Sequence, residues 1–160
     1  MNPVYAHFNY LALFIDIGWG LLGLTAILIF HGSAINHVIM KFEMRTKKNQ
    51  ALGQYNRVFT HFYIAFILIA LIHLSEILIW SVFIIQLDLI ADPVKAILFA
   101  GSCYTTVGFI EDILPEGWRS LAFFISFTGL FSLAWTTSVM IGMTNNYKIA
   151  WRKKYGKPLD

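Results

Sequence analysis

The chain has 160 residues, of which 58% are hydrophobic and only 13% are charged, and its mean hydropathy is +0.64. These values exclude an ordinary soluble domain and are typical of a membrane protein. The single cysteine, Cys103, excludes an intrachain disulfide and a CxxC-type metal site. Residues 1–8 contain no Lys or Arg, and the apolar run after them is too long for a signal peptide, so we expect it to be a retained span.

Three apolar segments are each long enough to cross a hydrocarbon core of about 30 Å, and they cover residues 8–30, 58–87 and 120–143. The first contains Asp16, for which the sequence indicates no partner. The second contains His73 and Glu76, and the third contains no charged residue. We therefore expect three transmembrane helices in an all-α membrane protein.

A fourth apolar segment, residues 96–103, is too short to cross a membrane. Asp92 and Pro93 before it are a typical N-cap and first helical residue, so we expect a short helix that begins there and ends near Tyr104. Gly108 then ends the helical pattern. Between two full spans, this arrangement predicts a re-entrant pore helix followed by a filter loop.

The basic residues indicate the orientation. Ten of the twelve lie either between the first two spans or after the last one, namely Lys41, Arg45, Lys47, Lys48, Arg57, Lys148, Arg152, Lys153, Lys154 and Lys157. The positive-inside rule places both segments in the cytoplasm and the N-terminus outside a cell (inner or plasma) membrane. The predicted outer side carries Lys95 and Arg119 but five acids, Asp88, Asp92, Glu111, Asp112 and Glu116, so we expect it to attract cations.

This pattern divides the chain into three parts. Residues 1–57 form an extra N-terminal transmembrane helix and a basic cytoplasmic connector, residues 58–144 form a pore domain, and residues 145–160 form a basic cytoplasmic tail. No internal repeat is visible, so one chain contributes one pore loop. A pore then needs several copies of the chain.

The stretch Thr105, Thr106, Val107, Gly108 and Phe109 resembles the selectivity filter of potassium channels. In such filters, backbone carbonyl groups from four chains replace the water around the ion, and a threonine hydroxyl adds a further oxygen. A helix that ends at this point also directs its negative dipole end toward the place where the cation would rest.

The resemblance extends over residues 58 to 143, to the bacterial pore proteins of the two-pore-domain-like potassium channel family. The sequence HLSEILIW at residues 73–80 is similar to that family's outer-helix signature, and LPEGWR at residues 114–119 is similar to its post-filter segment. GLFSLAWTT at residues 129–137 resembles its inner helix, in which Gly129 corresponds to a hinge, and the alternative for this glycine is close packing of helices at a small residue.

The chain departs from that family at one point. The family filter reads glycine, aromatic, glycine, aspartate, whereas this chain has Gly108, Phe109, Ile110 and Glu111. The filter glycines adopt positive φ, which is costly for a β-branched residue, so Ile110 predicts a flipped backbone or a rebuilt outer mouth. Thr106, Val107 and Gly108 remain as inner ion sites.

The resemblance implies a passive cation channel, with potassium as the ion, built as a homotetramer in a lipid bilayer. Its filter residues would be Thr105, Thr106, Val107, Gly108, Phe109 and Ile110, with Glu111 and Asp112 as outer-mouth acids. The alternative is a non-conducting accessory subunit of a larger membrane complex, packed against other membrane subunits. No catalytic constellation is visible, so we expect no enzyme activity, no cofactor, no metal beyond the transported cation and no nucleic-acid partner.

His73 and Glu76 stand three residues apart, on one face of the second span. Ionisable residues inside a membrane are commonly functional, which allows a gating or proton-sensing pair. The alternative is a structural hydrogen bond that anchors this span to the pore helix or to the third span. His31 and His73 could also suggest haem ligation, but no paired-histidine pattern supports it.

Overall fold

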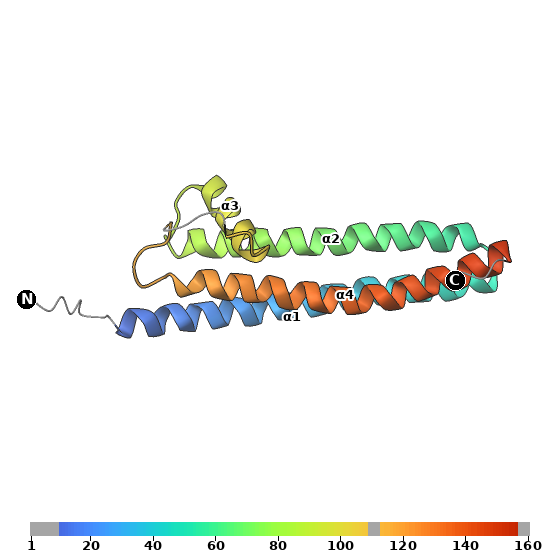
Figure 1. Ribbon diagram of the computed structural model, residues 1–160, viewed down its shortest axis with the longest axis horizontal. Coiled ribbons are helices and arrows are strands. Elements are labelled where there is room, and N and C mark those ends of the chain that lie inside the picture. Colours follow the sequence, from blue (N-terminus) through green and yellow to red (C-terminus); the bar gives the residue numbers. More distant parts are fainter. Residues whose placement is uncertain (1–9, 109–112, 157–160) are drawn as a thin grey trace, which may run out of the picture. The chain divides into compact units, whose positions relative to one another are not determined.

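The computed structural model describes residues 10–108 and 113–156, and in these residues all regular structure is helical. Four helices follow one another along the chain, α1 (Tyr10–Ala51), α2 (Tyr55–Gln86), α3 (Pro93–Tyr104) and α4 (Ser120–Tyr155) (Figure 1). Three of them, α1, α2 and α4, are long and apolar enough to cross a membrane. The predicted all-α fold with three long apolar helices is therefore confirmed.

Two of the long helices, α1 and α4, extend well beyond the predicted apolar spans, whereas α2 closely matches the predicted span of residues 58–87. With 42 and 36 residues, α1 and α4 are about 63 Å and 54 Å long, so each exceeds the hydrocarbon core of about 30 Å. In α1 the helix continues through the basic segment because buried side chains recur there at helical spacing, at Phe42, Thr46 and Asn49. Only residues 52–54 separate α1 from α2.

The short helix α3 begins where the sequence predicts. The side chain of Asp92 accepts hydrogen bonds from the backbone N–H groups of Val94 (2.8 Å) and Lys95 (3.3 Å). Pro93 occupies the first helical position, where its missing N–H costs nothing. The predicted helix from Pro93 to Tyr104 is thus confirmed, including its N-terminal cap.

The chain forms two compact units. The first consists of residues 1–28 and 77–130 and contains α3 together with parts of the three long helices. In Figure 1, α3 lies beside the C-terminal part of α2. The apolar core of this unit consists of Ile27, Trp80, Ile84, Ile90, Ala96, Phe99, Ala100, Cys103, Tyr104, Leu114, Leu121 and Ile125.

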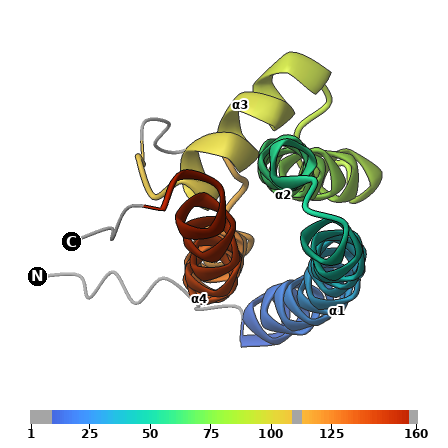
Figure 2. The same cartoon turned by 90° about the vertical axis from the view of Figure 1, so that its right-hand side faces the viewer.

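The second unit consists of residues 29–76 and 131–160, and α1, α2 and α4 lie side by side within it (Figure 2). Its apolar core is smaller and consists of Ile35, Val38, Phe42, Ala65, Ile69, Ile72 and Met143. The same unit buries the side chains of His31 and Glu76 completely.

Large apolar side chains cover the outer faces of the long helices. They include Leu11, Phe14, Ile29, Tyr63, Ile67, Leu71, Leu78, Phe123, Leu130 and Ile141, all exposed. A soluble protein rarely exposes so many large apolar side chains, because their contact with water is unfavourable. These faces are typical of helices surrounded by lipid.

Candidate functional site

The first four residues of the predicted filter follow α3 directly. The side chains of Thr105, Thr106 and Val107 are exposed, as is Gly108, and Val107 retains 66% of its accessible surface. The remaining predicted filter residues, Phe109 and Ile110, and the outer-mouth acids Glu111 and Asp112 lie outside the described residues. The described part of the predicted filter is therefore the segment of residues 105–108.

The end of α3 is closed by a Schellman motif. The N–H of Thr106 donates to the carbonyl of Cys103 (2.9 Å), and the N–H of Val107 donates to that of Ser102 (2.9 Å). This motif needs a left-handed backbone conformation at the residue that directly follows the C-cap. Thr106 occupies that position and has a φ of +59°. Gly108 is left-handed as well, with a φ of +65°.

All four helices are followed by a left-handed residue, and these residues are Gly53, Asp88, Thr106 and Gly156. Glycine adopts this conformation freely and aspartate tolerates it, whereas a β-branched residue is disfavoured there. Thr106 is therefore the strained member of the four. Backbone strain of this kind persists only where the surrounding structure imposes it, and it is common at functional sites.

The backbone N–H groups of residues 105–108 all point back to α3. Thr105 donates to the carbonyl of Gly101 (3.0 Å), and Gly108 shares the carbonyl of Ser102 with Val107 (3.3 Å and 2.9 Å). The hydroxyl of Thr105 also donates to Gly101 (2.8 Å). Among the described residues, no backbone N–H donates to the carbonyl groups of residues 105–108.

Gly129, the predicted hinge, contacts the end of α3. A Cβ atom added at Gly129 would collide with the carbonyl oxygen of Tyr104 and would lie 2.9 Å from its carbonyl carbon. Because these are backbone atoms, they cannot rotate away. Gly129 thus lets α4 approach the last residue of α3 closely, and the helix α4 is continuous through it.

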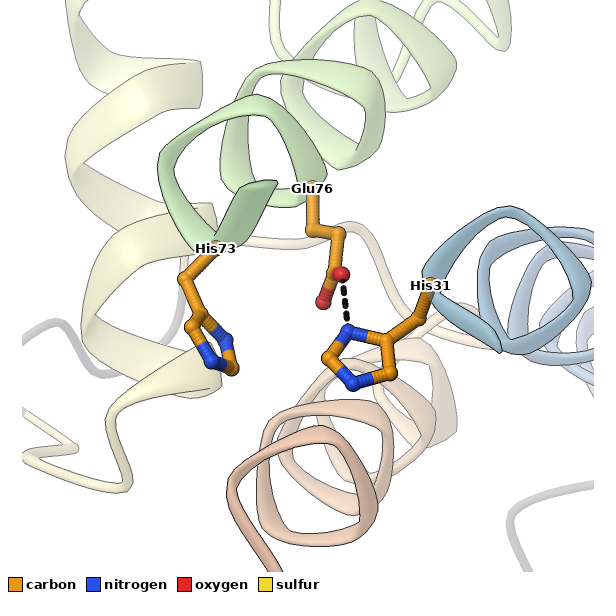
Figure 3. Close-up of side chains that lie close together, drawn as sticks. All are labelled: His31, His73 and Glu76. Carbon is orange, nitrogen blue, oxygen red and sulfur yellow. Dashed lines mark hydrogen bonds and ion pairs between the residues drawn. The ribbon is translucent and has the colours of Figure 1, made fainter. Parts of the chain in front are cut away.

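A buried polar cluster lies in the second unit and is formed by His31, His73 and Glu76 (Figure 3). Nδ1 of His31, on α1, lies 2.6 Å from Oε1 of Glu76, on α2. Both side chains are fully buried, whereas His73 is half-buried. Figure 3 shows the three side chains pointing into the same space between the helices.

The third long helix also contributes to this cluster. Nε2 of His73 lies 2.9 Å from the hydroxyl oxygen of Thr136 on α4, and the ring of Trp135 lies 5.8 Å from that of His31. Nε2 of His31 is buried and has no hydrogen-bond partner among the described residues. His73 thus contacts the third span, as the structural interpretation allowed, whereas Glu76 contacts the first span, which the sequence did not indicate.

Asp16 also has a partner. Its side-chain Oδ2 accepts a hydrogen bond from the backbone N–H of Ser120 (2.9 Å) and another from the Ser120 hydroxyl. Ser120 is the first residue of α4, so the carboxylate lies at the positive end of that helix.

Sequence reasoning considered His31 only as a possible haem ligand with His73, and it missed Thr136 and the contact between His31 and Glu76. A signal was available, because polar residues within apolar spans usually pair with one another. His31, His73, Glu76 and Thr136 are among the polar residues that occur in or beside the three predicted spans. Which of them meet depends on the rotation of each helix about its axis, which the sequence alone does not give.

Comparisons of the chain with protein-family models, with curated proteins and with solved structures gave no match. What the chain does has to be inferred from its residues and their geometry alone.

Proposed function

We propose that this chain is a pore-forming subunit of a passive cation channel, with potassium as the ion, and that four copies surround a central pore. The observation that carries the proposal is the half-length helix α3 and the exposed segment of residues 105–108 after it. At 12 residues α3 is about 18 Å long, which is too short to cross a membrane. It follows one long apolar helix and precedes another.

An exposed, non-helical segment is unfavourable in lipid, because its backbone carbonyl groups would lack hydrogen-bond partners. Such a segment is stable at membrane depth only where other protein covers it or where it lines water. In residues 105–108 the N–H groups are bonded to α3, and so the carbonyl groups remain as the polar surface. Carbonyl oxygens are the groups that replace the water around a potassium ion.

The electrostatics also favour a cation. The C-terminal end of α3 presents the negative end of the helix dipole beside residues 105–108. The loops on the predicted outer side carry Asp88, Asp92, Glu111, Asp112 and Glu116 but only two basic residues. Acids at a channel mouth raise the local concentration of cations.

We further propose that the C-terminal end of α4 and the α1–α2 turn face the cytoplasm. Lys48 lies in the last turn of α1, and Arg152, Lys153 and Lys154 lie in the last turn of α4. Rings from α2 and α4 form an aromatic cluster, which consists of Phe59, Tyr147, Trp151 and Tyr155. Aromatic and basic residues together are typical of the interface between a membrane and the cytoplasm.

The alternative is a non-conducting accessory subunit in which other membrane proteins cover residues 105–108. Ile110 stands where the family filter has its second glycine, and one ion site would therefore be lost. This departure favours the accessory function. The two functions differ in assembly, since a channel needs four identical copies around an axis and an accessory subunit does not. The mass of the purified, detergent-solubilised assembly distinguishes four copies from one.

The decisive experiment measures ion flux through the full chain reconstituted in lipid vesicles. The reversal potential under bi-ionic sodium and potassium conditions should show cation selectivity in the native chain and a stronger preference for potassium in Ile110→Gly. Gly108→Ala is the matched variant, since it loses a left-handed glycine and should reduce flux.

If the native chain and Ile110→Gly discriminate equally between sodium and potassium, the filter accommodates the isoleucine without loss of selectivity. A potassium ionophore added at the end shows whether the vesicles still hold an ion gradient. If they do and no variant gives any flux, the chain is not a channel by itself. The accessory function would then be the better account.

A further inference from the structure

The cluster of His31, His73 and Glu76 has the composition of a metal site. Each residue offers one ligand atom, and these three atoms lie within 4.8 Å of one another. We propose that the cluster binds one divalent transition-metal ion of the Zn²⁺ type. This site lies in the second unit, whereas residues 105–108 lie in the first, and its existence does not depend on ion conduction.

The distances require only small side-chain movements. Ligands that surround Zn²⁺ at about 2.0 Å in a tetrahedron lie about 3.3 Å from one another. The His31–Glu76 pair, at 2.6 Å, would widen slightly, and the wider gaps of the cluster would close. The three residues come from two different helices, so their separation is set by helix packing and not by a flexible loop.

The surroundings of the ligands also fit a metal. A histidine that binds zinc usually holds its second ring nitrogen in a hydrogen bond, which fixes the tautomer. For His73 this partner is the hydroxyl of Thr136, 2.9 Å from Nε2. The tautomer in which Nε2–H donates to Thr136 places the ring lone pair on Nδ1, where a metal can accept it.

The ring of His31 contacts Glu76 through Nδ1 alone among the described residues. Its side chain is fully buried, and Nε2 has no hydrogen-bond partner among the described residues. Leaving a buried polar atom unpaired typically costs about 1–3 kcal/mol. In the proposed site the metal takes Nδ1 of His31 and replaces the proton between this atom and Oε1 of Glu76, which is released, and the remaining ring proton then lies on Nε2.

The donor set determines which ions fit. Two imidazoles and one carboxylate suit zinc and its neighbours, whereas Mg²⁺, Ca²⁺ and K⁺ prefer sites made of oxygen alone. Three protein ligands leave one position open for water, and His73 is half-buried, so an ion can enter from that side. The site should therefore exchange its metal readily, unlike a closed four-ligand structural site.

The test uses the full chain, purified in detergent with a tag that contains no histidine and stripped of metal with a chelator. Co²⁺ is the probe, because its visible absorption becomes intense when it is held in a four-coordinate site. We expect saturation at one Co²⁺ per chain, displacement of Co²⁺ by Zn²⁺, and no displacement by an excess of Mg²⁺ or K⁺.

Variants then assign the ligands. His73→Ala and Glu76→Gln should abolish the four-coordinate absorption, and Thr136→Val should weaken binding by about 10- to 100-fold through its loss of contact with His73. His37→Ala is the matched control, since His37 lies on α1 like His31 but is exposed and outside the cluster. It should bind Co²⁺ as the native chain does.

Two results would overturn the proposal. The first is an absence of four-coordinate Co²⁺ absorption in the native chain, a measurement that does not require any variant to fold. The second is equal loss of binding in His37→Ala and His73→Ala when circular dichroism shows both to be as helical as the native chain. Either result is independent of whether the vesicles show ion flux.

Discussion

The carboxylate of Asp16 holds the first residue of α4, because its Oδ2 accepts hydrogen bonds from both the backbone N–H and the hydroxyl of Ser120. The first N–H groups of any helix have no partner within the helix itself. Asp16 supplies that partner from α1, within the first unit, and its negative charge lies at the positive end of the helix dipole. A charge within an apolar helix thus has a structural explanation.

Asp16→Ala should lower the stability of the protein by about 1–2 kcal/mol, because it removes an acceptor from a helix N-terminus. Asp16→Asn keeps an oxygen acceptor and should lose less than half of that amount. The thermal unfolding midpoint in detergent, followed by circular dichroism, measures both changes. If Asp16→Ala unfolds at the same temperature as the native chain, the contact with Ser120 contributes nothing to stability.

Gly129→Ala should destabilise the protein by about 1–3 kcal/mol, because the added methyl group collides with the backbone of Tyr104. Gly142 is the matched control on the same helix, since a Cβ atom added there meets nothing within 4 Å. Gly142→Ala should be neutral or should stabilise the helix by up to about 1 kcal/mol.

Unfolding midpoints of the two glycine variants check this difference, and equal midpoints would contradict the close approach of α3 and α4. The hinge role of Gly129 stays a prediction. A change in channel opening in Gly129→Ala would not by itself indicate a hinge, because the same substitution displaces the end of α3.

Thr106→Gly should stabilise the protein by about 1 kcal/mol, because glycine adopts a φ near +59° without the steric cost that threonine meets there. Asp88 occupies the equivalent position after α2 and tolerates the left-handed region better. Asp88→Gly should therefore gain less than Thr106→Gly. A loss of stability in Thr106→Gly would mean that the threonine side chain makes contacts that outweigh its backbone strain.

The proposed topology can be tested by labelling with a membrane-impermeant thiol reagent added to intact cells. Lys48→Cys should react only after the cells are permeabilised, whereas Val94→Cys should react at once, and both positions are exposed. The native chain is the control for background, since its single cysteine, Cys103, is buried. A buried thiol is poorly accessible to the reagent, so labelling of Cys103 should be slow. Immediate labelling of Lys48→Cys would reverse the proposed orientation.

The sequence predicts α3 well because its signals are local. Asp92 and Pro93 specify the first turn, and the helix begins there. The ends of α1 and α4 were not predicted, because hydropathy indicates where apolar residues stop and not where the helix stops. Polar residues such as Lys48 continue a helix readily when other side chains, such as Phe42 and Thr46, are buried at helical spacing.

The candidate sites were predicted less completely. The pairing of His31 with Glu76 joins residues 45 positions apart, so it depends on tertiary packing. The left-handed conformation of Thr106 goes against the preference of threonine and follows from hydrogen bonds to Cys103 and Ser102. The backbone preference of threonine alone therefore could not have indicated this conformation.

The dependence of residues 105–108 on α3 makes this segment a single cooperative unit. Their four N–H groups donate to only three carbonyl groups, those of Gly101, Ser102 and Cys103, so unwinding the last turn of α3 would release all four at once. Hydrogen exchange would then give these amides one common opening free energy, instead of four values that decline along the loop. The order of the proposed ion-binding segment is thus set by the last turn of α3, and a substitution that loosens this turn would change the segment without altering any of its residues.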